Sequence, residues 1–259
     1  MPRSLLYLLI GLALAGIAMF KFIAPIPQPQ WYHQFADRRS FVGIANFWDV
    51  LSNLPLLVVG VWGICHLQFS DGKGGIKDSA VIRMYMFFFL AMALTGLGSA
   101  YYHLAPDNQR LVWDRLPLAV MLMALLAVIV TERAHRRAGI LLFFVLPTFG
   151  AATVYYWHLT ESWGRGDLRP YLLMQLYPAV AIPLILWFCP QSHTKTEKLY
   201  SAVAWYAGAK LYEFLDKEIY ALGHLLSGHT LKHIGAGISC YMILSWLRER
   251  DRVTAAAAL

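Results

Sequence analysis

Five polar side chains lie at the ends of hydrophobic segments in a pattern that suits metal chemistry. Ser99 and His103 are four residues apart at the end of one apolar run, and Asp114 lies at the start of the next. His229 and His233, again four residues apart, open the last apolar run. Residues i and i+4 share one face of a helix, so each pair can point toward one place. In a catalytic zinc site, three neutral imidazoles can bind the ion and leave its fourth position open for water.

A site of this kind supplies hydrolytic chemistry, because zinc lowers the pKa of a bound water to about 7. Asp114 is then a candidate base for that water, or a group that orients a ligand ring. Ser99 is a candidate donor to a developing oxyanion. A single histidine at a helix end is more often an interfacial or packing residue, and one His-x3-His pair is a weak signal. Polar groups from three separate segments at one depth in a membrane indicate a metal site more strongly than either of these signals alone.

The elements that position these residues are hydrophobic helices. The chain is 58% hydrophobic and only 14% charged, whereas soluble domains contain roughly 25% charged residues. A membrane core requires roughly 20 apolar residues per helix. Seven runs lack Asp, Glu, Lys and Arg, and an eighth apolar stretch contains a few of them; in chain order they are Ser4–Phe20, Val50–Ser70, Met84–Pro106, Leu116–Thr131, Ala138–Thr160, Pro170–Thr194, Leu199–Leu222 (the charged one) and His233–Leu247.

We therefore predict an all-α, polytopic transmembrane helix bundle. Its eight spans and short connections leave no room for a separate soluble domain. The first run also has the character of a signal peptide, since Arg3 precedes it. Phe-Lys-Phe-Ile follows the run in place of a small-residue cleavage site, which favours a retained helix.

The distribution of positive charge predicts the orientation of the bundle. Lys and Arg are more frequent at the helix ends that lie inside when the N-terminus is inside, which favours an N-in, C-in topology. In that orientation the three histidines and Asp114 all lie toward the outer side of the membrane. The net charge of +7 is therefore a topology signal. No segment is both basic and aromatic, so we predict no nucleic-acid partner, and the oligomeric state is left open.

Other polar residues in the apolar runs have structural interpretations. Ser52 and Asn53 are expected to form hydrogen bonds between helices. Glu213 can pair with Lys210 at i−3 and with Lys217 at i+4, which predicts a structural ion-pair cluster in the eighth stretch. A proton or substrate role for that cluster is the alternative.

Two further groups of polar residues are assigned to the surface. The segment around Asp167 and Arg169, which also contains Glu161 and Arg165, predicts a charged and solvated outer loop, with binding of a lipid headgroup as the alternative. The remaining histidines, His33 among them, lack partner spacing and are interpreted as interfacial residues. The three cysteines lack metal or disulfide spacing.

Four ordered segments resemble those of the alkaline ceramidases. They are Asn46-Phe-Trp-Asp-Val-Leu-Ser-Asn53, Gly98-Ser-Ala-Tyr-Tyr-His103, Trp113-Asp114 and His229-x3-His233. Alkaline ceramidases belong to a superfamily of seven-helix membrane hydrolases that includes proteins of the adiponectin-receptor type. The resemblance extends from about Asn46 to Leu247. A bacterial ceramidase-like branch is the most similar, through Phe35-Ala-Asp-Arg38, Ala105-Pro-Asp-Asn108 and Tyr212-Glu-Phe-Leu-Asp216.

This resemblance implies a fold and a set of site residues. It implies a seven-helix hydrolase domain over residues 46–250, preceded by an extra N-terminal transmembrane helix and an outer loop over residues 1–45. It implies a zinc ion held by His103, His229 and His233, with Ser99 and Asp114 as catalytic residues that assist the attacking water. It also implies a bacterial inner (plasma) membrane location.

The segment before the first core helix departs from the animal alkaline ceramidases. Those enzymes carry an acidic, Trp-containing calcium-binding segment that ends in a Glu of an Ala-Glu-Phe-Trp context. Here the context reads Ala45-Asn46-Phe47-Trp48, and the upstream Asp-Trp-x-Glu pattern is absent. A calcium ion is therefore doubtful, with Asp37 and Asn46 as weak candidates, and the substrate inference weakens with it.

The sequence thus predicts a zinc-dependent amidohydrolase of lipid metabolism, acting in the membrane. The expected substrate is ceramide or another N-acyl lipid, cleaved to a fatty acid and a free amine. The alternative from a different class is a receptor or sensor of the adiponectin-receptor type, in which the zinc is structural. A transporter is a weaker third interpretation, suggested only by the charged residues around Lys210.

Overall fold

The computed structural model describes residues 2–69, 76, 78–189 and 195–256. Ser70 and residues 190–194, at the ends of two predicted spans, lie outside this set. The all-α prediction is confirmed, because the described residues form helices and no β-strand. The helices are α1 (Arg3–Ala18), α2 (Phe47–Leu51), α3 (Leu54–Phe69), α4 (Ser79–Leu104), α5 (Asn108–Ile129), α6 (Arg136–Ser162), α7 (Arg169–Phe188), α8 (Glu197–Phe214), α9 (Asp216–Ala221) and α10 (Gly228–Ala256).

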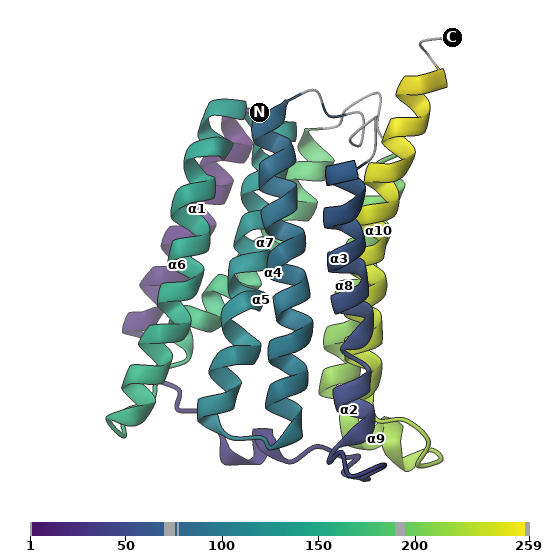
Figure 1. Cartoon of the computed structure of the whole chain (residues 1–259). Helices are drawn as coiled ribbons and strands as arrows, with labels where there is room; N and C mark the ends of the chain where they lie inside the picture. The colour runs from purple at the N-terminus through teal and green to yellow at the C-terminus, as the bar shows by residue number, and fades with distance from the viewer. Residues whose placement is uncertain (1, 70–75, 77, 190–194, 257–259) are drawn as a thin grey trace.

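Shorter helical pieces join these elements. Two 3-10 helices, η1 (Met19–Lys21) and η2 (Gln30–His33), follow α1, and a π-helical turn, η4 (Val130–Ala134), ends α5. The long helices run alternately up and down (Figure 1). Figure 1 shows α2, α9 and the connection from α4 to α5 at one end of the bundle, and the end of α10 at the opposite end.

Six helical segments of the described chain are long and apolar enough to cross a membrane, which confirms the transmembrane bundle. They are Arg3–Lys21, Phe47–Phe69, Ser79–Leu104, Asn108–Ala134, Arg136–Ser162 and Arg169–Phe188. The long helices α8 and α10 are not among the six, because α8 carries Lys210 and Glu213 and α10 begins with His229, Lys232 and His233. Their polar residues face other helices, as shown below.

The buried fraction of each helix indicates whether it lies at the centre of the bundle or at its edge. The most apolar part of the α5 segment is 67% buried, whereas that of the α1 segment is only 11% buried and packs chiefly on α7. Helix α5 packs along α4 and α6, and α10 packs along α8 and α3. The α4–α5 hairpin thus forms the middle of the bundle, and the catalytic candidates on these helices are held by the most deeply packed pair.

Glycine allows the closest approach between α4 and α5. A Cβ atom at Gly98 would lie 2.0 Å from the carbonyl oxygen of Trp113. Only a residue without a side chain permits this contact between backbones. The approach brings the turn of α4 that carries Ser99 against the turn of α5 that carries Asp114.

The charged segment between α6 and α7 is solvated only in part. Arg165 is exposed, as the sequence predicts, whereas Asp167 and Arg169 are held in an ion pair. Asp167 is only 3% exposed and forms an ion pair of 2.7 Å with Arg169. Arg169 also donates to the backbone oxygen of Phe20, and Glu161 accepts from the backbone N–H of Gln28. The hydrogen bond from Arg169 holds the pKa of the Asp167 carboxyl below its usual range. The segment therefore anchors the chain that follows α1.

Candidate metal centre

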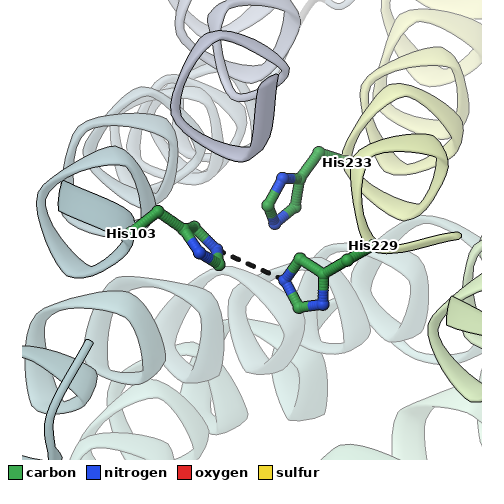
Figure 2. Close-up of side chains that lie close together, drawn as sticks. All are labelled: His103, His229 and His233. Carbon is green, nitrogen blue, oxygen red and sulfur yellow. Dashed lines mark hydrogen bonds between the residues drawn. The ribbon is translucent and has the colours of Figure 1, made fainter. Parts of the chain in front are cut away.

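The three histidines that the sequence analysis selected converge at one end of the bundle. His103, on the last turn of α4, and His229 and His233, on the first turns of α10, are 1%, 4% and 3% exposed. Each pair of rings has centroids 4.8 Å apart. One ligand atom from each ring lies within 4.8 Å of the others, and Figure 2 shows the rings turned toward a common centre. This buried cluster can bind a metal ion.

The cluster fits zinc in its donor chemistry and its spacing. The Nε2 atoms of His103 and His229 face each other at 3.3 Å. Two nitrogens bound at about 2.0–2.1 Å to one tetrahedral ion are themselves about 3.3 Å apart. Nε2 of His233 and Nδ1 of His103 are buried and have no hydrogen-bond partner among the residues that the structure describes. Buried polar atoms without partners are rare, so a role as a metal ligand accounts for the free nitrogen of His233.

Polar residues before α3 hold the ring of His233. The Oγ atom of Ser52 lies 2.9 Å from Nδ1 of His233 and also donates to the backbone oxygen of Asp49. Because the Ser52 proton is used in that second bond, its oxygen accepts from Nδ1–H of His233, which leaves Nε2 as the free lone pair. The amide nitrogen of Asn53 lies 3.3 Å from the same Nδ1. Ser52 therefore bonds between helices as predicted, and its partner is a candidate ligand. The amide of Asn53 donates instead to the backbone oxygen of Asp49.

Two aspartates that the sequence analysis did not select tie α10 to the rest of the site. Asp49 is 0% exposed and accepts from the hydroxyl of Thr230 at 2.7 Å. Asp216 accepts from the backbone N–H of His229 at 2.8 Å, and its other oxygen accepts from the backbone of Ala36. A signal was present in the sequence, since Asp216 lies within a predicted apolar stretch and Asp49 directly precedes one, and an ionisable residue in a membrane span is a functional candidate.

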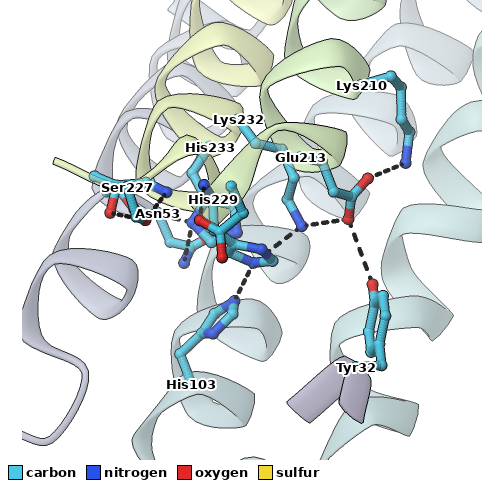
Figure 3. A network of polar contacts seen from close by, with 12 residues as sticks. Tyr32, Asn53, His103, Lys210, Glu213, Ser227, His229, Lys232 and His233 are labelled. Carbon is cyan, nitrogen blue, oxygen red and sulfur yellow. Dashed lines mark hydrogen bonds and ion pairs between the residues drawn. The ribbon is translucent and has the colours of Figure 1, made fainter. Parts of the chain in front are cut away.

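A partly buried ion-pair cluster borders the histidines, with different partners from those predicted. Glu213 pairs with Lys210 as expected, at 2.9 Å, but its second partner is Lys232 of α10, also at 2.9 Å, in place of Lys217. Lys232 in turn lies 3.1 Å from Nε2 of His229 (Figure 3). An imidazole nitrogen has one lone pair, so donation from Lys232 and binding of a metal at that atom exclude each other. When Nε2 of His229 binds a metal, Lys232 still has Glu213 as its partner.

The predicted catalytic residues share a cavity with one histidine of the cluster, His233. Ser99, on α4, is 3% exposed, and Asp114, on α5, is half-buried. Both line a cavity of about 390 Å³ together with His233 and Lys232. The structure thus brings Ser99 and Asp114 to the cavity beside His233, although no hydrogen bond from either to a histidine is among the contacts of the described residues.

His33 is part of the site's surroundings and is not merely interfacial. Its Nδ1 lies 2.9 Å from the hydroxyl of Tyr102, and its Nε2 lies 2.9 Å from the side-chain oxygen of Asn108. These contacts fasten η2 to the α4–α5 connection, next to His103. Sequence spacing gave no sign of this, because His33 is far from both partners along the chain.

The candidates for a calcium site have other partners. Asp37 is 2% exposed and pairs with Arg39 at 2.6 Å, so its carboxylate faces a guanidinium. The side-chain amide of Asn46 donates to the backbone oxygen of His103 at 2.8 Å. Asn46 therefore positions the end of α4 through its amide group.

The fold and the site together define a helical membrane protein with a buried three-histidine centre at one end of its bundle. A family model for ceramidases matches residues 40–255. The chain belongs to the ceramidase family, which confirms the resemblance to alkaline ceramidases.

A curated relative agrees with this assignment. The protein named "Putative alkaline ceramidase dcd3A" from Dictyostelium discoideum is 26% identical to this chain over 95 residues. The match covers 34% of this chain and 33% of that protein, so the chain spans about a third of the length of the curated relative it matches.

Proposed function

We propose that this protein hydrolyses the amide bond of a ceramide-like N-acyl lipid, giving a fatty acid and a free amine. The observation that carries the proposal is the buried triad of His103, His229 and His233, of which His233 lines a cavity together with Ser99 and Asp114. Membership of the ceramidase family supports the choice of a lipid amide as the substrate.

In this proposal the three histidines hold a zinc ion. A zinc ion held by them would supply an acidified water and a polarised amide carbonyl. Asp114 accepts the proton of the attacking water and returns it to the leaving nitrogen. Ser99 donates a hydrogen bond to the carbonyl oxygen as negative charge develops on it. The C–N bond of the amide breaks, the carbonyl carbon takes the hydroxyl of the water, and the nitrogen takes its proton. The products are a carboxylic acid and an amine.

A second cavity provides space for an acyl chain. It has a volume of about 110 Å³, is almost entirely apolar and shares Leu56, Thr95, Leu118, Tyr206 and Ala236 with the polar cavity. It extends from these shared residues to Ile129 and Leu186, near the opposite end of the bundle. We propose that the hydrocarbon chain lies there while the amide group is at the histidines.

The orientation in the membrane is also proposed from the sequence. The positive-inside distribution favours N-in and C-in, which places the histidines toward the outer side. Helix α1 begins and α10 ends at the end of the bundle opposite to the histidines, as this topology requires (Figure 1). The orientation can be tested by introducing single cysteines into the loops of the protein and labelling them in intact cells.

Turnover of lipid amides by the purified full chain tests the function. Mass spectrometry would follow release of palmitate from C16 ceramide and from N-palmitoylethanolamine. We expect zinc at about one per chain and loss of release after chelation, with recovery on adding zinc. The variants His103→Ala, His229→Ala and Asp114→Ala should each lower the rate by about 100-fold or more. The matched control is His224→Asn, which changes an exposed histidine and keeps a residue that tolerates its positive φ.

Unchanged turnover in the three variants would contradict the proposal. Zinc binding without release of acid from any lipid amide would instead support the receptor or sensor interpretation, in which zinc is structural. Flux of a solute that is lost in Lys210→Ala and survives zinc removal would support a transporter.

A further inference from the structure

Arg115, the residue after Asp114, is a buried cation without an anionic partner. It is 5% exposed, and its Nη1 atom is buried with no hydrogen-bond partner in the described part of the chain. No carboxylate of the described residues forms an ion pair with it. A charged side chain in a membrane bundle is costly and normally pairs with another group. Arg115 therefore lacks a partner that its position requires.

Aromatic rings hold the Arg115 guanidinium in place without neutralising it. Its Cζ atom lies 4.3 Å from the ring centre of Trp157, 4.8 Å from that of Tyr171 and 5.5 Å from that of Tyr32. Cation–π contacts stabilise a guanidinium through contact between its flat faces and the aromatic rings. The N–H groups point outward in the plane of the guanidinium, so its edge remains available for hydrogen bonds.

The cavity that Arg115 lines has more cationic than anionic side chains. Arg115, Lys210 and Lys232 line it, against Asp114 and Glu213. Both lysines pair with the same carboxylate, that of Glu213. Asp114 is only half-buried, and a divalent metal at the histidines would increase the excess of positive charge. An anionic group from a ligand would balance this charge.

We propose that the cavity beside the histidines binds an oxyanion group of its lipid ligand, a carboxylate or a phosphate, through the guanidinium of Arg115. The planar fork of arginine matches the two oxygens of such a group in a bidentate pair. The identity of the ligand as an N-acyl lipid rests on the proposed function; the anion site itself rests on Arg115 and the cavity. The group has two possible sources, the headgroup of the intact lipid or the carboxylate of the released fatty acid.

Lipids that have the same acyl chain but differ in charge test whether the cavity binds an anion. Binding of palmitate and of its uncharged methyl ester to the full chain would be measured in detergent, together with turnover of N-palmitoylglycine and N-palmitoylethanolamine. We expect palmitate to bind about tenfold or more tightly than the ester. Arg115→Gln should bring this ratio close to one. Arg115→Lys, which keeps the charge and loses the fork, should give an intermediate ratio.

The matched control is Arg133→Gln. Arg133 is also buried, at 7% exposed, and lies over a tryptophan ring, that of Trp246, but it belongs to η4 at the other end of the bundle. This variant should leave the ratio unchanged. Thermal unfolding and zinc content of every variant would show that the folded protein is being compared.

The outcomes assign the source of the anion and separate this proposal from the hydrolase. A preference for N-palmitoylglycine that depends on Arg115 places the charge on the headgroup; discrimination confined to palmitate places it on the released acid. Palmitate binding that depends on Arg115 without hydrolysis of any amide would support the anion site and contradict the hydrolase. Hydrolysis with equal binding of palmitate and ester, or a ratio unchanged in Arg115→Gln, would overturn the anion site alone.

Discussion

At the scale of single residues, the chemistry of the histidine cluster depends on hydrogen bonds from side chains around it. His233 presents Nε2 to the cluster because its Nδ1 donates to Ser52, and Ser52 is itself fixed by the backbone of Asp49. Partners of this kind set the tautomer and the orientation of a metal-binding ring. His103 is held differently, through its backbone oxygen and the amide of Asn46.

We expect Ser52→Ala to weaken zinc binding by about 10-fold to 100-fold, the usual effect of losing such a partner. The fold should persist, because the change removes one hydroxyl from a buried helix end. Competition between the purified protein and a zinc chelator of known affinity measures the change. Ser245→Ala is the control, since Ser245 lies on the same helix as His233 but bonds to Lys198 at the far end. Equal zinc affinity in Ser52→Ala and the wild type would show that Ser52 does not orient the ring.

At the scale of elements, the α4–α5 hairpin sets the position of Ser99 and Asp114 relative to His103. The two helices are close enough that a side chain at Gly98 would overlap the backbone of Trp113. Packing between helices in membranes relies on small residues for such contacts. The hairpin therefore couples a packing requirement directly to the geometry of the site.

Gly98→Ala should destabilise the protein by about 1–3 kcal/mol, because the added methyl group must push two backbones apart. We also expect lower turnover, since Asp114 moves with the backbone of Trp113. Gly208→Ala is the matched change, in a helix and with nothing within 4 Å of the added atom; it should change stability by less than about 1 kcal/mol. Equilibrium unfolding in mixed detergent measures both variants, and equal stabilities would refute the close approach.

At the scale of the whole molecule, the bundle joins a polar cavity at one end to an apolar cavity that extends toward the other. The polar cavity contains the site candidates, and the apolar one has almost no polar lining. An amphipathic substrate with a polar end and a hydrocarbon chain matches this gradient. The gradient arises from the packing of α3, α4, α5, α7, α8 and α10 together.

Ala236 lies where the two cavities meet, because it lines both. Ala236→Leu should narrow the junction and shift the preference from C16 toward C8 acyl chains by about tenfold in the ratio of kcat/KM. Ala152→Leu is the control, since Ala152 is exposed on the outside of α6. Competition between C16 and C8 substrates in one reaction gives the ratio directly. An unchanged ratio would mean that the acyl chain does not pass this point.

Local and compositional properties of the sequence determined the class of fold and the cluster of candidate ligands. Runs of apolar residues predict membrane helices because each span must bury its own backbone polar groups. His-x3-His predicts two rings on one face because the period of the helix is fixed. The ends of the runs place His103 near the same depth, since helices of similar length cross the same bundle. None of these inferences requires knowledge of how the helices pack.

Only the tertiary structure decided which other side chains face that cluster. The rotation of each helix about its axis is set by packing, so sequence alone did not indicate that Lys232 meets Glu213, that Ser52 holds His233, or that Arg115 lies among aromatic rings. The same limit explains the wrong partner for Glu213, which was chosen from spacing along one helix. Contacts within a helix follow from its period, whereas contacts between helices follow from the packing of the whole bundle.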